Sequence, residues 1–199
     1  MNTFGRNFRL SIFGESHGSC IGITIDGVKA GIAIQPNDFT KDLDRRRAGK
    51  EGTTPRTEDD SPKLISGVHN GHTTGSPLTI IFDNTNVHSN DYENLKQTPR
   101  PGHADFTACQ KHHGFNDPRG GGHFSGRLTL ALVAAGVIAK KIIEPVQIDA
   151  ELLSVKGSPN ITETIKKAKE LGDSVGGIIE CRAKNMPIGL GEPFFDSLE

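Results

Sequence analysis

The chain has 199 residues with 23 basic and 24 acidic side chains, giving a formal net charge of −1. A charge this close to zero provides no global attraction to nucleic acid or to an anionic membrane, so we expect neither as a partner. Only 34% of the residues are hydrophobic and mean hydropathy is −0.41, with 24 glycines and 11 prolines, which predicts a single domain over residues 1–199 that is rich in loops.

The first predicted elements are β-strands. Apolar residues at every second position predict one strand at residues 8–13 and a second at residues 21–25. Asp26-Gly27 suits a tight turn, so we expect the chain to open with an antiparallel meander. After a short helix, apolar runs predict two further strands at residues 64–68 and 78–82.

The short helix is expected to begin at Asn37, which is a favoured N-cap residue. Phe39 and Leu43 are spaced to share its buried face. Arg46 and Arg47 fall in its last turn, where positive charge favours the negative end of the helix dipole.

Two long loops are predicted at residues 50–63 and 83–122, because both stretches are polar and rich in turn-forming residues. Loops of this length are usually functional or disordered. Catalytic residues are often carried on loops that a rigid scaffold positions.

The clearest helix is predicted after Gly126, where apolar residues leave almost no polar face. They are Leu128, Leu130, Leu132, Val133, Val137, Ile138, Ile142 and Ile143. A helix that is apolar all round is buried on several sides. Lys140 and Lys141 suit its negative C-terminal end, and Pro145 follows just beyond it.

A second helix is predicted at residues 161–171, with Asn160 and Glu163 spaced as a capping box. Residues 178–183 then predict a strand. Strands followed by helices in this order predict an α+β fold.

Three glycine-rich motifs carry ionisable side chains: GESHG at residues 14–18, RPGHAD at 100–105 and GGGHFSGR at 120–127. The histidine in each can donate or accept a proton near neutral pH. The glycines let backbone and ligand approach closely, which suits a phosphorylated small molecule or a cofactor. These motifs predict an enzyme.

The motifs also belong to an ordered series that resembles the chorismate synthase family. The series consists of FRLSIFGESHG at 8–18, DLDRRRAG at 42–49, SGVHNGHTTGSPL at 66–78, NDY at 90–92, RPGHADFT at 100–107, GGGHFSGRLTLALVAAGVIAKKI at 120–142 and MPIGLGEPFFD at 186–196. The resemblance covers nearly the whole chain, yet members of that family continue past its last residue. The chain therefore resembles the N-terminal part of a longer enzyme, truncated at the C-terminus.

The resemblance implies a β-α-β sandwich with helices between antiparallel sheets. It also implies a lyase of the shikimate pathway, which leads to aromatic amino acids. The reaction is an anti-1,4-elimination of phosphate from 5-enolpyruvylshikimate 3-phosphate to give chorismate. The family uses reduced FMN as a transient electron donor, with NADPH a candidate reductant for the flavin, and its members are commonly homotetramers.

For individual residues, the resemblance implies that His17 protonates the departing phosphate and that His103 protonates or neutralises the reduced flavin. Arg46, Arg100 and Arg127 are implied at the anionic substrate site, where a guanidinium can make paired hydrogen bonds to phosphate or carboxylate. A purely structural role stays open for both histidines, because each could be an ordinary turn or loop residue. Arg46 could equally be a solvent-facing helix residue.

The glycine loop supplies the implied cofactor-binding residues His123, Phe124 and Ser125, with Arg46 added from the short helix. Ser125 could also be an ordinary N-cap of the apolar helix. The loop departs from the common family pattern, because many members have arginine and serine where this chain has His123 and Phe124. Leu128 departs from that pattern as well. Leu132 and His88 stand where positively charged residues are common in the family.

Two alternatives to the complete enzyme stay open, and a third is not supported by the sequence. One is an incomplete scaffold or flavin-binding fragment, because the apolar helix predicts a core in either case. Another is a metal-binding protein using Cys109, His112 and His123, although the spacing of these residues is unlike that of zinc sites. A dinucleotide-binding fold at Gly120-Gly121-Gly122 is not supported, because the preceding residues are too polar for a buried strand.

The three cysteines are odd in number and lack CxxC spacing, so we expect no disulfide framework and a reducing, cytoplasmic location. We find no apolar run near the ~20 residues that cross a bilayer, and no export signal at the N-terminus. These observations predict a soluble protein.

Overall fold

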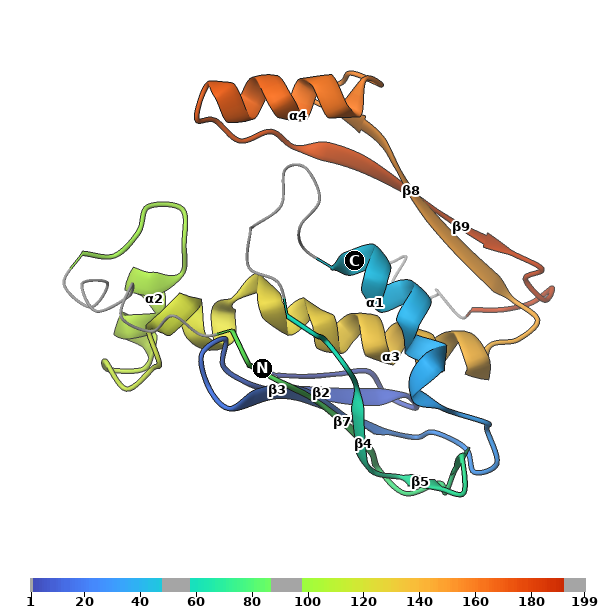
Figure 1. Ribbon diagram of the computed structural model, residues 1–199. Coiled ribbons are helices and arrows are strands. Elements are labelled where there is room, and N and C mark those ends of the chain that lie inside the picture. Colours follow the sequence, from blue (N-terminus) through green and yellow to red (C-terminus); the bar gives the residue numbers. More distant parts are fainter. Residues whose placement is uncertain (1, 48–57, 87–97, 192–199) are drawn as a thin grey trace. The chain divides into compact units, whose positions relative to one another are not determined.

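The computed structural model describes residues 2–47, 58–86 and 98–191. The chain divides into two compact units, Met1–Ile142 and Ile143–Glu199 (Figure 1). His88, the NDY motif, residues 50–57 of the first predicted loop and the last part of the closing motif lie outside the described residues. That a single domain spans all 199 residues stays a prediction.

The first unit is built on an antiparallel sheet of five strands in the order β1-β2-β3-β7-β4. The strands are β1 (Thr3–Phe4), β2 (Arg9–Gly14), β3 (Cys20–Asp26), β7 (Leu78–Asp83) and β4 (Lys63–Ser66). Ile23 of β3 pairs with Ile12 on one side and Ile80 on the other, so apolar residues align across the sheet. The strands predicted at residues 8–13, 21–25 and 78–82 and the opening antiparallel meander are confirmed. The strand predicted at residues 64–68 ends at Ser66, because Gly67 has φ 80° and Val68 belongs to the separate strand β5 (Val68–His69).

The turn predicted at Asp26-Gly27 ends β3, but it does not join β3 to a neighbouring strand as a hairpin. The neighbours of β3 in the sheet are β2 and β7. Gly27 has φ 85°, and a Cβ there would lie 1.7 Å from the backbone oxygen of Asn7. Glycine is therefore needed for close approach to the loop between β1 and β2. A small two-stranded sheet, β5 (Val68–His69) with β6 (His72–Thr73), lies between β4 and β7 in the chain.

The predicted short helix begins as a 3-10 turn, η1 (Pro36–Phe39), and continues as α1 (Thr40–Arg46). Phe39 and Leu43 are buried together, as expected. The prediction of Asn37 as N-cap is wrong, because Gln35 takes that position and its backbone N–H donates to Asp38 Oδ2 at 2.8 Å. Pro36 lies in the first turn, where its missing N–H costs nothing.

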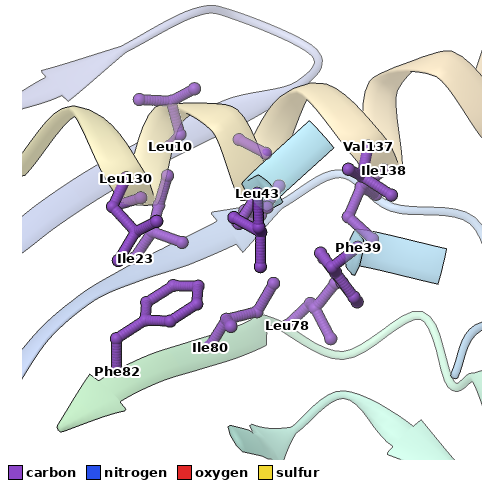
Figure 2. Close-up of a cluster of buried hydrophobic side chains, with 14 of the residues drawn as sticks. Leu10, Ile23, Phe39, Leu43, Leu78, Ile80, Phe82, Leu130, Val137 and Ile138 are labelled. Carbon is purple, nitrogen blue, oxygen red and sulfur yellow. The ribbon is translucent and has the colours of Figure 1, made fainter. Parts of the chain in front are cut away.

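The predicted apolar helix is α3 (Thr129–Ile142), which packs against β2, β3 and β7 on one side and α1 on another. Its side chains Leu130, Val137 and Ile138 meet Ile23, Ile80 and Phe82 from the sheet and Phe39 from η1 in one cluster (Figure 2). Lys140 and Lys141, expected only to favour the helix dipole, also form ion pairs with Asp42 and Asp38.

By length and composition, one helical stretch in the described part of the chain, residues 119–142, could cross a membrane, which our sequence interpretation did not find. Half of the apolar 18-residue window within this stretch is buried inside the protein. Its regular α-helix covers only Thr129–Ile142, because Gly120, Gly121 and Gly122 have non-helical backbone angles. Burial of α3 in the core accounts for its apolar character.

The long loop predicted at residues 83–122 contains a helix, α2 (Asp105–Lys111), and part of the 3-10 segment η3 (Arg119–Phe124). A second 3-10 turn, η4 (Gly126–Leu128), leads into α3. Only Ala108 of α2 is buried, so the sequence shows no apolar stripe there from which a helix could be predicted.

The second unit is an antiparallel ribbon of β8 (Gln147–Val155) and β9 (Gly177–Lys184), joined by α4 (Ile161–Glu170). The predicted β9 and α4 are confirmed, while β8 was not predicted. The predicted capping box differs, because Asn160 Nδ2 donates to Glu163 Oε2 at 2.7 Å and its side chain caps no backbone N–H. Helices combined with antiparallel sheets confirm the α+β class.

Candidate active site

His17 lies in the loop between β2 and β3, residues 15–19, which we call the His17 loop. The residue is only 6% exposed, and its neighbour Ser16 is 2% exposed. An ordinary turn residue at a strand end would face solvent. Burial of an ionisable side chain in a loop is typical of a functional site, because such burial costs free energy unless something compensates it.

The glycine loop, residues 120–122, lies directly against the His17 loop. All three of its glycines have positive φ, between 54° and 82°. A Cβ on Gly120 would lie 2.6 Å from His17 Nε2, and the Ser16 N–H donates to Gly122 O at 3.0 Å. The structure therefore brings together two of the three motifs singled out from the sequence.

His123 is held at the end of β2. Its Nδ1 lies 2.8 Å from Gly14 O, and its Nε2 lies 3.1 Å from Asn2 Oδ1. Because a carbonyl oxygen can only accept, Nδ1 carries the hydrogen in this contact. The ring thus ties the glycine loop to the strand that precedes His17.

Phe124 and Ser125 follow His123. The Phe124 ring is 47% exposed and meets the His123 ring nearly edge-on, with centroids 6.2 Å apart. Ser125 is the N-cap of η4, and its Oγ accepts from the Arg127 N–H at 3.3 Å. Ser125 is therefore an N-cap, as the structural alternative predicted. Capping is compatible with a binding role, because the neighbouring Phe124 is exposed.

Arg100 and Asp105 form a two-pronged ion pair, with Arg100 Nε 2.8 Å from Oδ2 and Nη2 3.0 Å from Oδ1. The Nη2 atom would lie 3.7 Å from a Cβ on Gly121, so the guanidinium stands at the glycine loop. His103 is exposed in the turn between them. Asp105 therefore orients Arg100.

The Asp105 carboxyl has a pKa below its ordinary value. The largest cause is the side-chain hydrogen bond from Arg100; burial opposes it, while the Arg100 backbone N–H and the charges of Arg100 and His103 lower the pKa further. The pair therefore stabilises the fold above an unfolded-state pKa of about 3.9, and this contribution is lost as pH falls through the lower folded-state pKa.

We expect Asp105→Asn to lower the free energy of unfolding by about 1 kcal/mol at neutral pH, because it removes a charge-assisted hydrogen bond. Below about pH 4 the difference from the unmodified chain should shrink, because its own Asp105 becomes protonated. Urea unfolding at neutral pH and at about pH 3 measures both effects. A difference that stays constant with pH would contradict the assignment.

Arg127 is buried and points into the protein. Its Nη1 pairs with Asp60 Oδ1 at 2.8 Å, its Nε donates to Asn84 Oδ1 at 2.6 Å, and its Nη2 donates to Asp83 O at 3.2 Å. Its assignment to substrate stays a prediction, but these contacts give it a structural role that the sequence did not indicate.

Arg46 approaches the other oxygen of the same carboxylate, with Nη1 3.7 Å from Asp60 Oδ2. Its Nη2 donates to Gly126 O at 3.2 Å. Burial lowers the pKa of Arg46, the charge of Asp60 opposes that shift, and the charge of Arg127 adds to it. Arg46 is therefore partly buried and held by contacts within the fold, which differs from the solvent-facing alternative.

Sequence reasoning missed Asp117, which lies three residues before the glycine loop. Its carboxylate holds Arg119 through contacts of 2.9 Å to Nε and 2.8 Å to Nη2. These hydrogen bonds are the main cause that lowers the pKa of Asp117, and the charge of His17 contributes as well. An aspartate followed by proline just before three glycines was an available turn signal.

The structure gives no support to the metal-binding alternative in the part of the chain that it describes. Among the residues that the structure describes, which include Cys109, His112 and His123, no group of three or more histidine, cysteine or acidic side chains could hold a metal ion. The physical reason is that the His123 ring nitrogens face Gly14 and Asn2.

The chain is similar to known proteins over its whole length. A family model described as chorismate synthase matches residues 8–199. The chain is 59% identical to the chorismate synthase of Chitinophaga pinensis over 200 residues, covering all of this chain and 60% of that protein. It is 42% identical to that of Dehalococcoides mccartyi strain BAV1, covering all of this chain and 63% of that protein.

A crystal structure titled chorismate synthase has the same fold, with a TM-score of 0.70 at 24% identity. The match covers 94% of this chain and 60% of the other. The chain thus spans about 60% of the length of the relatives that it matches. On sequence and fold together, the chain belongs to the chorismate synthase family.

Proposed function

We propose that the protein is a chorismate synthase, a lyase that eliminates phosphate and a ring proton from 5-enolpyruvylshikimate 3-phosphate in a reaction that requires reduced FMN. The observation that carries the proposal is the buried His17 held against the glycine loop beside Arg100. Departure of a phosphate requires a proton donor and positive charge, and His17 and Arg100 both stand at the glycine loop.

The residues present fit an anionic cofactor. Gly121 has φ 82°, and the nearest atoms to a Cβ there would be Arg100 Nη2 and Ser125 Cβ at 3.7 and 3.9 Å, so the loop leaves space beside a positive charge. Phe124, which follows this loop in the chain, is 47% exposed and could contribute an aromatic ring. In this proposal Phe124, Ser125, His123 and Arg46 hold the flavin.

The bound reduced flavin would supply transient electron density to the substrate ring. His17 would hold a proton at Nε2 and deliver it to the departing phosphate. Arg100, oriented by Asp105, would bind the substrate's anionic groups, with Arg46 and Arg127 as further candidates. His103 would balance charge near the flavin.

The test is an anaerobic titration of the purified protein with reduced FMN, with and without 5-enolpyruvylshikimate 3-phosphate, while chorismate absorbance is followed. We expect saturable flavin binding that substrate tightens. In His17→Gln, binding should persist while turnover falls about 10²- to 10⁴-fold, the range for loss of general acid catalysis. Equal turnover in both proteins would remove His17 from the proposed mechanism.

The same titration decides between the enzyme and the second candidate, an incomplete scaffold or flavin-binding fragment. The chain covers 60% of the length of the Chitinophaga pinensis protein that it matches. Flavin binding without chorismate would support the fragment, and absence of both would support the scaffold.

We also propose a cytoplasmic homotetramer, with NADPH as the flavin reductant. Light scattering would measure the assembly. Flavin reduction by added NADPH, followed at the flavin absorbance, would test the reductant, and cell fractionation would test the location.

A further inference from the structure

The His17 loop is fastened by a residue from a different strand, Asn84, which immediately follows β7. Asn84 Nδ2 donates to Glu15 O at 3.0 Å and to Gly18 O at 2.9 Å. Its backbone N–H donates to Ser19 O at 3.1 Å. One residue thus contacts the carbonyls on both sides of His17.

Asn84 is itself held in place by its side-chain oxygen, which accepts from Arg127 Nε at 2.6 Å. That contact selects the orientation in which the amide nitrogen faces the His17 loop, because an arginine nitrogen can only donate. Glu58 Oε2 accepts the backbone N–H of the next residue, Thr85, at 3.0 Å. The position of Asn84 is therefore determined from two sides.

We propose that Asn84 is a positioning residue that fixes the His17 loop, and that Arg127 acts through Asn84 as its orienting partner. The consequence for catalysis rests on the function proposed for His17. An error of about 1 Å in the position of a reacting group costs up to about 10²-fold in rate, so a fixed loop would contribute directly to turnover.

The variant Asn84→Asp separates this role from a merely structural one. An aspartate has the same size and keeps an acceptor for Arg127, now with a charge-assisted contact. It lacks both amide hydrogens and places negative charge against the carbonyls of Glu15 and Gly18. If Asn84 served only to satisfy Arg127, this substitution would be harmless.

Hydrogen exchange followed by NMR in the 199-residue chain measures the outcome without any need for activity. The probes are the Gly18 N–H, bonded to Glu15 O inside the loop, and the Ser16 N–H, bonded to Gly122 O. In Asn84→Asp we expect both to exchange about tenfold faster or more, the effect of losing about one net hydrogen bond. Amides of the β3–β7 ladder should keep their rates.

A matched control is Asn37→Asp, which makes the same chemical change at an exposed position in η1. It should leave the exchange of Ser16 and Gly18 unchanged. Unchanged exchange of these amides in Asn84→Asp would overturn the proposal. A uniform increase that includes the ladder amides would overturn it too, because that would show global destabilisation.

A kinetic measurement tests the consequence for the reaction. If the unmodified protein makes chorismate, Asn84→Asp should lower kcat while KM changes little, because a misplaced acid affects the transition state more than binding. If the unmodified protein makes none, the proposed function fails, and the exchange rates still decide whether Asn84 positions the loop.

Discussion

Gly120→Ala is expected to reduce chorismate formation by at least about 10²-fold while leaving a folded protein. A Cβ at this position would lie 2.5 Å from His17 Cδ2, 2.6 Å from its Nε2 and 2.9 Å from Ser16 Oγ. Carbon atoms do not approach this closely, so the buried imidazole must move. A displaced proton donor loses the alignment that general acid catalysis requires.

The backbone effect of the substitution has to be separated from the collision. Gly120 has φ 59°, where an alanine costs roughly 1 kcal/mol. Gly31→Ala is the matched control, because Gly31 has φ 88° and no atom within 4 Å of a Cβ. Both variants should show a similar small loss of melting temperature, but only Gly120→Ala should lose turnover and shift the NMR signals of the His17 ring. Wild-type turnover in Gly120→Ala would show that His17 is not the acid.

Much of the scaffold could be predicted from local patterns. The alternation of isoleucines in β3 and the apolar run of α3 are strong periodic signals, and both elements formed near the predicted residues. The strand β8 gave a weaker signal. Its apolar Ile148, Ala150 and Leu152 alternate with Asp149 and Glu151, but the ribbon leaves most of these side chains partly exposed.

The candidate site, too, could be predicted from the sequence only in part. His17, the glycine loop and Arg100 stand out in the sequence because ionisable residues lie among glycines. The partners that fix them do not stand out, because Asp60 and Asn84 lie far along the chain from the groups that they bind. Asn84 in particular falls in a stretch that composition alone predicts to be a polar loop. Such pairings depend on how strands align, which local periodicity does not determine.

Asp60→Asn is expected to be the most destabilising polar substitution in this network, lowering the free energy of unfolding by about 3 kcal/mol. The Asp60 side chain is 3% exposed and lies between the guanidinium groups of Arg127 and Arg46. Removing its charge leaves two buried or partly buried cations facing one another without compensation. That loss is a large share of the roughly 5–15 kcal/mol by which domains are stable.

Asparagine is the appropriate replacement because Asp60 has φ 53°, a conformation that asparagine tolerates and most other residues do not. The control is Asp26→Asn, which breaks the exposed ion pair between Arg9 and Asp26, with side chains 56% and 44% exposed. Exposed ion pairs contribute little to stability because solvent screens them, so this variant should unfold almost as the unmodified chain does. Urea denaturation of the three proteins gives the comparison. Equal losses of unfolding free energy in both variants would show that the Asp60 site is as well solvated as the surface. The network that joins Arg46, Arg127 and Asn84 would then not be what holds the His17 loop.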